Sequence, residues 1–183
     1  MIILGVDPGA GTTGYGVVAQ QSGGAASLIE CGVIRTDAKT PLAQRLKELY
    51  LGIGEVIARC EPTSVAVEGV FYGKNVRTTV ILGHARGAIL LAATMRDLPV
   101  SEYSPAEIKN AIVGHGRAGK EQVQFMVQRL LRLKTAPSPA DAADGVAVAL
   151  CHGNSANLDR LRPPVRVTGD YSLQSLKALA AHD

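Results

Sequence analysis

The chain has 183 residues, of which 46% are hydrophobic and only 4% aromatic, so we expect one domain with a mostly aliphatic core. Its three cysteines are odd in number and widely spaced. They form no C-x-x-C pair, which argues against a disulfide framework or a zinc site and favours a reducing, cytoplasmic setting. The net charge of +3 is mild, and neither a basic leader nor an apolar run of membrane-spanning length is present, so we expect a soluble protein without a membrane partner.

The first predicted strand, Ile2 to Val6, is short and rich in branched residues, as is typical of a strand buried on both faces. Asp7 ends it, a glycine-rich turn follows, and Tyr15 to Ala19 is predicted as the second arm of a hairpin. A buried strand can hold a carboxylate in place while glycines leave room for a substrate. Two alternatives stay open here, an aspartate that only caps the turn and the phosphate-binding loop of an actin-like kinase.

Three more elements follow in order. Ala26 to Thr36 alternates as a third strand does, and three consecutive strands without an intervening helix favour an antiparallel arrangement. Thr40-Pro41 predicts a helix start, with Thr40 as N-cap and proline at the first helical position, and Glu61-Pro62 ends that helix. Ser64 to Glu68 is predicted as a fourth, buried strand, and it again ends on a carboxylate.

A long helix is predicted over Asn75 to Arg96, in which Gly83 and Gly87 lie one turn apart and would let another helix approach closely. Pro99 to Tyr103 is predicted as the fifth strand, and Ser104 to Glu107 has the spacing of a capping box that opens a short helix.

Two further helices complete the predicted domain. Lys120 to Leu133 is amphipathic, and Ser138 to Asp141 repeats the N-cap pattern and opens a last core helix that runs to about His152. The composition then shifts toward arginine and proline. We therefore expect an α/β domain over residues 1–154 and a basic, flexible tail over residues 155–183.

Positive charge is concentrated between Phe71 and Lys134, where ten basic residues face four acidic ones. This excess favours a polyanionic partner, although ordinary solvated helix faces explain it equally well.

Four carboxylates are candidates for one catalytic site. The element order places Asp7 and Glu68 at the ends of strands that could be neighbours, and Asp141 and Asp144 share one face of a helix. If that helix packs on the sheet, the four groups repel one another, and hard divalent cations such as Mg²⁺ or Mn²⁺ relieve the repulsion. Two ions about 3.5–4 Å apart would then support phosphoryl transfer. The structural alternatives are a capping role for Asp141 with Ser138 and an ion pair between Glu68 and a lysine.

From Ile3 to about His152 the sequence resembles the RuvC family of Holliday-junction resolvases. The blocks that carry the resemblance are Ile3–Gly9, Thr13–Val17, Val67–Phe71, Lys74–Asn75, Leu82–Gly87, Val113–Gly116, Lys120–Val123 and Ala140–Asp144. The resemblance implies an RNase H-like α/β fold, in which three antiparallel strands precede βαβ units in one mixed sheet flanked by helices.

The resemblance also implies roles for individual residues. Asp7, Glu68, Asp141 and Asp144 match the catalytic acids that bind two ions, and Lys109 and Lys120 match lysines near the scissile backbone, with Lys120 counted as catalytic. Phe71 matches an aromatic residue that stacks on bases, and Tyr72 beside it would share that role. The remaining expected phosphate contacts are Lys74, Arg77 and Arg117.

By this resemblance the chain cuts Holliday junctions by paired symmetric nicks in bacterial recombination and repair, alongside the RuvA–RuvB branch-migration complex. A four-way DNA junction has approximate two-fold symmetry, so an isologous homodimer is implied. The helix face with Gly83 and Gly87 is its candidate interface, with core packing of these glycines as the alternative. The alternative functions are an RNase H-like nuclease acting on structured RNA and a junction-binding protein without hydrolysis.

Overall fold

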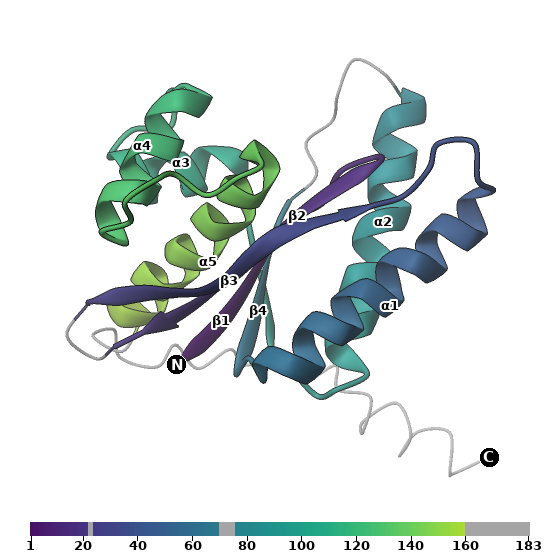
Figure 1. Ribbon diagram of the computed structural model, residues 1–183, viewed down its shortest axis with the longest axis horizontal. Helices are drawn as coiled ribbons and strands as arrows, with labels where there is room; N and C mark the ends of the chain where they lie inside the picture. Colours follow the sequence, from purple (N-terminus) through teal and green to yellow (C-terminus); the bar gives the residue numbers. More distant parts are fainter. Residues whose placement is uncertain (22–23, 70–75, 160–183) are drawn as a thin grey trace, which may run out of the picture.

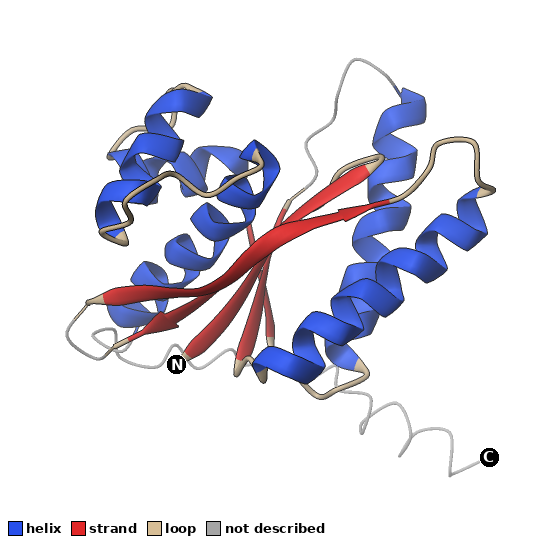
Figure 2. Cartoon of the chain, viewed as in Figure 1, coloured by secondary structure: helices blue, strands red, loops and turns tan. Residues whose placement is uncertain are grey.

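The structure is a computed structural model that describes residues 1–21, 24–69 and 76–159. A five-stranded mixed sheet with the order β3-β2-β1-β4-β5 forms its centre (Figures 1 and 2). The strands are β1 Ile2–Asp7, β2 Thr12–Gln20, β3 Ala26–Arg35, β4 Ser64–Glu68 and β5 Val100–Tyr103. The first three pair antiparallel, whereas β4 runs parallel to β1 and β5 parallel to β4. The predicted RNase H-like sheet is confirmed.

Helices cover both faces of this sheet, as Figure 1 shows. On one face lie α1 Leu42–Cys60 and α2 Val76–Thr94, and on the other lie α3 Pro105–Val113, α4 Lys120–Leu130 and α5 Ala140–Asp159. The central strand β1 is buried on both sides, because Leu4 and Val6 pack in the α1–α2 cluster and Ile3 packs in the α3–α5 cluster. This burial agrees with the branched, apolar sequence of the strand.

Helix α5 lies in direct backbone contact with the sheet. A Cβ atom on Gly14 of β2 would fall 1.8 Å from the carbonyl oxygen of Asp141, and one on Gly145 of α5 would fall 2.5 Å from the Cα atom of Tyr15. Only glycine permits such an approach, since any larger residue would force the two elements apart. The contact brings the first turn of α5 beside the carboxyl end of β1.

Several predicted helix ends differ from the structure. Helix α1 begins at Leu42 with Pro41 at the N-cap and no side-chain capping bond, so the predicted N-cap Thr40 and the placement of Pro41 inside the helix are wrong. The amide of Thr40 donates to the carbonyl of Asp37 in a turn instead. The capping box of Ser104 and Glu107 is confirmed.

The ends of the last two helices also differ from their predicted positions. Helix α4 stops at Leu130 rather than Leu133. Arg132 adopts a left-handed φ of 53°, which ends the helix, and the Gln128 side chain donates a hydrogen bond to the carbonyl of Leu133. Helix α5 continues to Asp159, past the predicted end near His152. The Asn154 side chain, which donates to the carbonyl of Ala111 in α3 at 3.5 Å, anchors this extension.

Within the described part of the chain, α2 is the one helix that is long and apolar enough, by length and composition alone, to cross a membrane. In the fold one face of α2 packs against α1 and the sheet and buries Ala85, Ile89, Ala92 and Ala93. The helix therefore has a second apolar face that the described residues leave exposed, including Val76, Val80 and Leu91.

Candidate active site

Asp7 and Glu68 lie at the same edge of the sheet. Val6 pairs with Val67 across the parallel β1–β4 ladder, and the two carboxylates follow these residues at the ends of their strands. Burial raises the pKa of Asp7 to about 8, and the neighbouring Glu68 carboxylate contributes to the rise. Burial also raises the pKa of Glu68, with Asp144 contributing. Asp7 therefore keeps its proton near neutral pH beside the Glu68 carboxylate.

Asp141 lies in the first turn of α5 and Asp144 lies three residues further along the helix, and both pair with the ammonium of Lys120. The Nζ atom of Lys120 lies 2.7 Å from Oδ2 of Asp144 and 3.4 Å from Oδ1 of Asp141. Lys120 is the first residue of α4, and the preceding turn is held by the Gln122 side chain, which accepts from the amide of Gly119 at 2.9 Å. The hydrogen bond to Asp144 raises the pKa of Lys120, so this side chain carries its positive charge.

A cavity of about 260 Å³ brings most of these groups together. Its polar lining comes from β1, β4, α3, α4 and α5, and consists of Asp7, Glu68, Lys109, Lys120 and Asp144. Its apolar lining consists of Pro105, Ile108, Val123 and Ala147. The structure thus assembles three of the four predicted carboxylates and both predicted lysines in one pocket.

Asp141 stands at the edge of this arrangement, outside the cavity lining. Its side chain is 44% exposed, whereas that of Asp144 is 18% exposed. The carboxylate of Asp141 accepts a hydrogen bond from Lys120, so it has a partner that the capping alternative did not foresee.

The donor set of the pocket suits a hard cation. All four acids offer oxygen atoms, and a proton on Asp7 and the ammonium of Lys120 offset only part of their negative charge. Across the described ranges of the chain, no three His, Cys, Asp or Glu side chains already stand close enough together to hold a metal ion. A cation could therefore be held by Asp7, Glu68, Asp141 and Asp144 only after side-chain rotation.

The other predicted contact residues are dispersed. Arg117 is exposed in the connection before α4, and Arg77 lines a separate hollow of about 450 Å³ between the first turns of α1 and α2, together with Arg45 and Thr40. The predicted contacts Phe71, Tyr72 and Lys74 lie outside the described residues.

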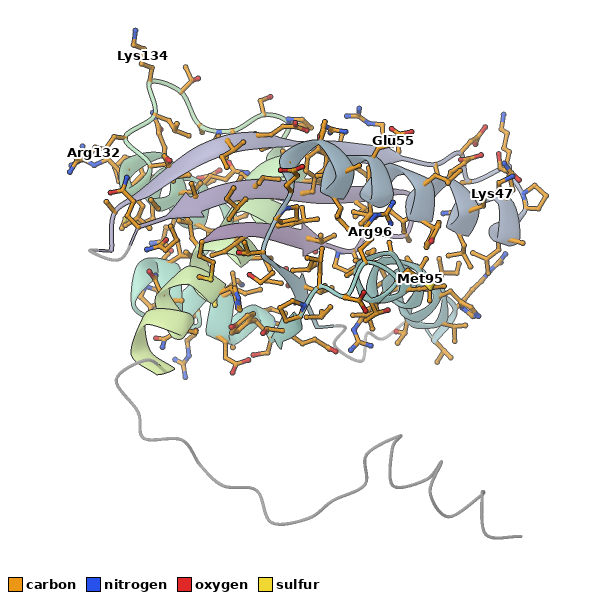
Figure 3. All side chains as sticks on the ribbon, turned by 90° about the horizontal axis from the view of Figure 1, so that it is seen from below. Lys47, Glu55, Met95, Arg96, Arg132 and Lys134 are labelled. Carbon is orange, nitrogen blue, oxygen red and sulfur yellow. The ribbon has the colours of Figure 1, made fainter. Side chains whose placement is uncertain are left out.

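The basic excess found in the sequence does not form one continuous surface. Arg86 is paired with Glu102, and Arg96 donates to the carbonyl of Ala92 while its guanidinium lies against Gly54 of α1. Arg132 and Lys134 project away from the fold (Figure 3). Ordinary solvated and paired positions thus account for part of the excess.

Arg45 of α1 is a site residue that the sequence did not reveal. Its Nη2 atom donates to the carbonyl of Ala10 in the glycine-rich turn after Asp7, and its Nε atom donates to Oγ1 of Thr36 at 3.2 Å. These bonds join the turn to α1. An arginine within an amphipathic helix carries no sequence signal for such a role.

Comparison with known proteins gives three concordant results. A family model described as crossover junction endodeoxyribonuclease RuvC matches residues 3–152. Relatives that carry the same description include one from Pelotomaculum thermopropionicum, 48% identical over 160 residues (87% of this chain, 97% of the relative). Another, from Moorella thermoacetica, is 50% identical over 157 residues (85% of this chain, 93% of the relative).

Solved structures agree with these relatives. Thermus thermophilus RuvC in complex with a Holliday junction substrate superposes with a TM-score of 0.82 at 38% identity, over 87% of this chain and 96% of that one. The yeast mitochondrial Holliday junction resolvase Ydc2 superposes with a TM-score of 0.64 at 15% identity, over 87% and 82% of the two chains, which is a likeness of fold alone.

Proposed function

Because this chain belongs to the RuvC family of crossover junction endodeoxyribonucleases, we propose that Asp7, Glu68, Asp141 and Asp144 form its catalytic site and hold two Mg²⁺ or Mn²⁺ ions. The activity itself, endonucleolytic cutting of DNA at crossover junctions, follows from the family. The family match spans all four carboxylates and both pocket lysines.

The main evidence for this proposal is the cavity that Asp7, Glu68 and Asp144 line together. Burial and neighbouring carboxylates raise the pKa of Asp7 to about 8, so these acids hold more negative charge than the pocket stabilises. Pairs of divalent ions in such sites activate a water molecule and stabilise charge on the leaving oxygen. A donor set made only of carboxylate oxygens is the kind that Mg²⁺ and Mn²⁺ prefer.

The basic residues have roles that follow from their positions. Lys109 and Lys120 line the cavity and would neutralise the scissile phosphate and its developing charge. Arg77 and Arg117, which lie away from the cavity, would contact the DNA backbone of the junction arms. Base stacking by Phe71 and Tyr72 and a phosphate contact by Lys74 remain predictions on residues outside the described ranges.

The substrate would be a four-way DNA junction, cut by two symmetric nicks that leave 5′-phosphate and 3′-hydroxyl ends. The similarity to Thermus thermophilus RuvC bound to a Holliday junction supports this choice. Cutting two opposed strands requires two sites related by two-fold symmetry, so the active form would be an isologous homodimer. Cooperation with RuvA–RuvB in the bacterial cytoplasm remains a prediction from the family.

The outer face of α2 is the surface we propose for dimerisation. Among the described residues, a Cβ atom on Gly83 or Gly87 would meet no other atom within 4 Å, which favours the interface over the core-packing alternative. Exposed apolar side chains continue the same face along the helix. They are Val76, Val80, Leu91 and Met95, which are 75%, 51%, 53% and 65% exposed.

The test is incubation of the chain with a synthetic mobile four-way junction, with Mg²⁺ or with a chelator, and mapping of both nicks. We expect paired nicks in the presence of Mg²⁺, and an Asp7→Asn variant that binds the junction without cutting it. Cutting by this variant would remove Asp7 from the site. Cleavage of structured RNA in preference to the junction, or binding without any nick, would favour one of the alternative functions.

A further inference from the structure

The four carboxylates are divided into two pairs by their positions. Asp7 and Glu68 end neighbouring parallel strands, whereas Asp141 and Asp144 on α5 share the ammonium of Lys120. Lys120 approaches from α4 with a side chain that is 52% exposed, so its charged end is free to move while its backbone is fixed in the first turn of the helix.

We propose that Lys120 is a competitor for one of the two cations. Its ammonium occupies the carboxylate oxygens of Asp144 and Asp141 that the cation would use, and cation binding releases it toward the DNA phosphate. This inference rests on the proposed function, since it assumes that the four carboxylates bind metal. Lys120 would thus couple metal loading to contact with the substrate.

The geometry allows this exchange. The ammonium of Lys120 lies 2.7 Å from Oδ2 of Asp144, at a distance from which it would repel a cation that approached the same oxygen. Ion pairs between partly exposed groups are weak and exchange readily with other cations. Asp144 is the more buried of the two aspartates, so a positive partner stabilises its charge more than that of Asp141.

Lys109 provides a matched comparison. It lines the same cavity from α3, and its positive charge lowers the pKa of Glu68. The ion pairs with Asp141 and Asp144 are made by Lys120 instead. Loss of either lysine removes one positive charge from the pocket, and only loss of Lys120 frees carboxylate oxygens. A purely structural bridge between α4 and α5 would instead make Lys120 important for stability without affecting metal affinity.

The experiment is titration of the full chain with Mn²⁺ in the absence of DNA, with free Mn²⁺ followed by electron paramagnetic resonance. We expect Lys120→Met to tighten the weaker Mn²⁺ binding step by about fivefold or more, and Lys109→Met to change it by less than about twofold. Thermal unfolding of both variants checks that the fold is kept.

Equal effects of the two substitutions, or weaker Mn²⁺ binding by Lys120→Met, would overturn the inference while leaving the metal site in place. The proposed function fails in a different way. A wild-type chain that binds no Mn²⁺, or an Asp7→Asn variant that binds it as well as wild type, would show that these carboxylates are not a metal site at all.

Discussion

Gly14 lies directly across the β1–β2 ladder from Asp7, at the point where the backbone of α5 touches the sheet. The residue opposite the first catalytic candidate therefore has no side chain, because the carbonyl of Asp141 occupies that space. One backbone contact thus sets the position of the acids on α5 relative to the acid on β1.

Substitution Gly14→Ala tests this contact. The new methyl group would lie 1.8 Å from the carbonyl oxygen of Asp141, so α5 must shift. We expect unfolding free energy to fall by about 1–3 kcal/mol from overpacking. Junction cutting should fall about 100-fold, because small displacements of catalytic groups are costly. Chemical denaturation and single-turnover nicking measure the two effects.

Gly11→Ala is the control for that experiment, since a Cβ atom there would have its nearest neighbour 3.9 Å away, the carbonyl oxygen of Thr36. This variant should remain close to wild type in both assays. An equal loss of cutting in the two variants would mean that the glycine-rich turn, rather than the position of α5, limits activity.

The raised pKa of Asp7 predicts an unusual pH dependence of stability. Burial and Glu68 raise this pKa from 3.8 to about 8, so between these values the folded state keeps a proton that the unfolded state has lost. Stability without divalent ions should therefore fall as pH rises from about 4 to 8. Asp7→Asn, which stays neutral and can donate to Glu68, should be more stable than wild type by about 1–3 kcal/mol at pH 8.

Thermal unfolding in a chelator across this pH range measures the difference between Asp7→Asn and wild type, which should shrink toward pH 4. Added Mg²⁺ should stabilise wild type more at pH 8 than at pH 5, because it replaces the proton of Asp7, and it should stabilise the variant little. A wild-type chain that gains stability between pH 5 and 8 in chelator would contradict the assignment.

Gly87→Leu tests the outer face of α2. The part of the chain that the structure describes leaves open space at this position, and leucine is a better helix former than glycine, so the folded monomer should not be destabilised. We expect dimer formation, followed by sedimentation velocity, to weaken at least about tenfold. Paired nicking should give way to single nicks or no cutting.

Leu51→Ala is the matched control for the α2 face, because Leu51 is a 49% exposed leucine on α1, outside the proposed interface. Its dimerisation should equal that of wild type. Dissociation caused by Leu51→Ala, together with an intact Gly87→Leu dimer, would move the interface to α1.

Arg45→Ala tests the role of Arg45 as a positioning residue. Loss of its hydrogen bonds to Ala10 and Thr36 should loosen the turn that follows Asp7. We expect the cutting rate to fall about tenfold at saturating junction, with junction affinity changed less than twofold. The control Gln44→Ala removes a neighbouring side chain that only contacts Glu48 on the surface, and it should cut normally. If Arg45→Ala instead lowered junction affinity about as much as it lowered the cutting rate, Arg45 would be assigned to DNA binding.

The sequence alone determined the order of the strands along the chain, the positions of Asp7 and Glu68 at the ends of two of them, and the capping box at Ser104. These features depend on local periodicity and on residue types that break or cap elements, so they can be read without knowing what packs against what. The ends of α1, α4 and α5 were predicted wrongly. At α5 the difference involves a hydrogen bond to another segment, from Asn154 to Ala111, whereas at α1 and α4 it involves local turn bonds that the residue pattern did not indicate.

Only the tertiary structure decided how the acids share their charge. Nothing in the sequence indicates that Lys120 lies between Asp141 and Asp144, that Asp7 keeps a proton, or that Gly83 and Gly87 face outward. Each of these facts depends on distances between groups far apart in the chain. Electrostatic and steric energies change over a few ångströms, whereas sequence spacing specifies only which residues could meet.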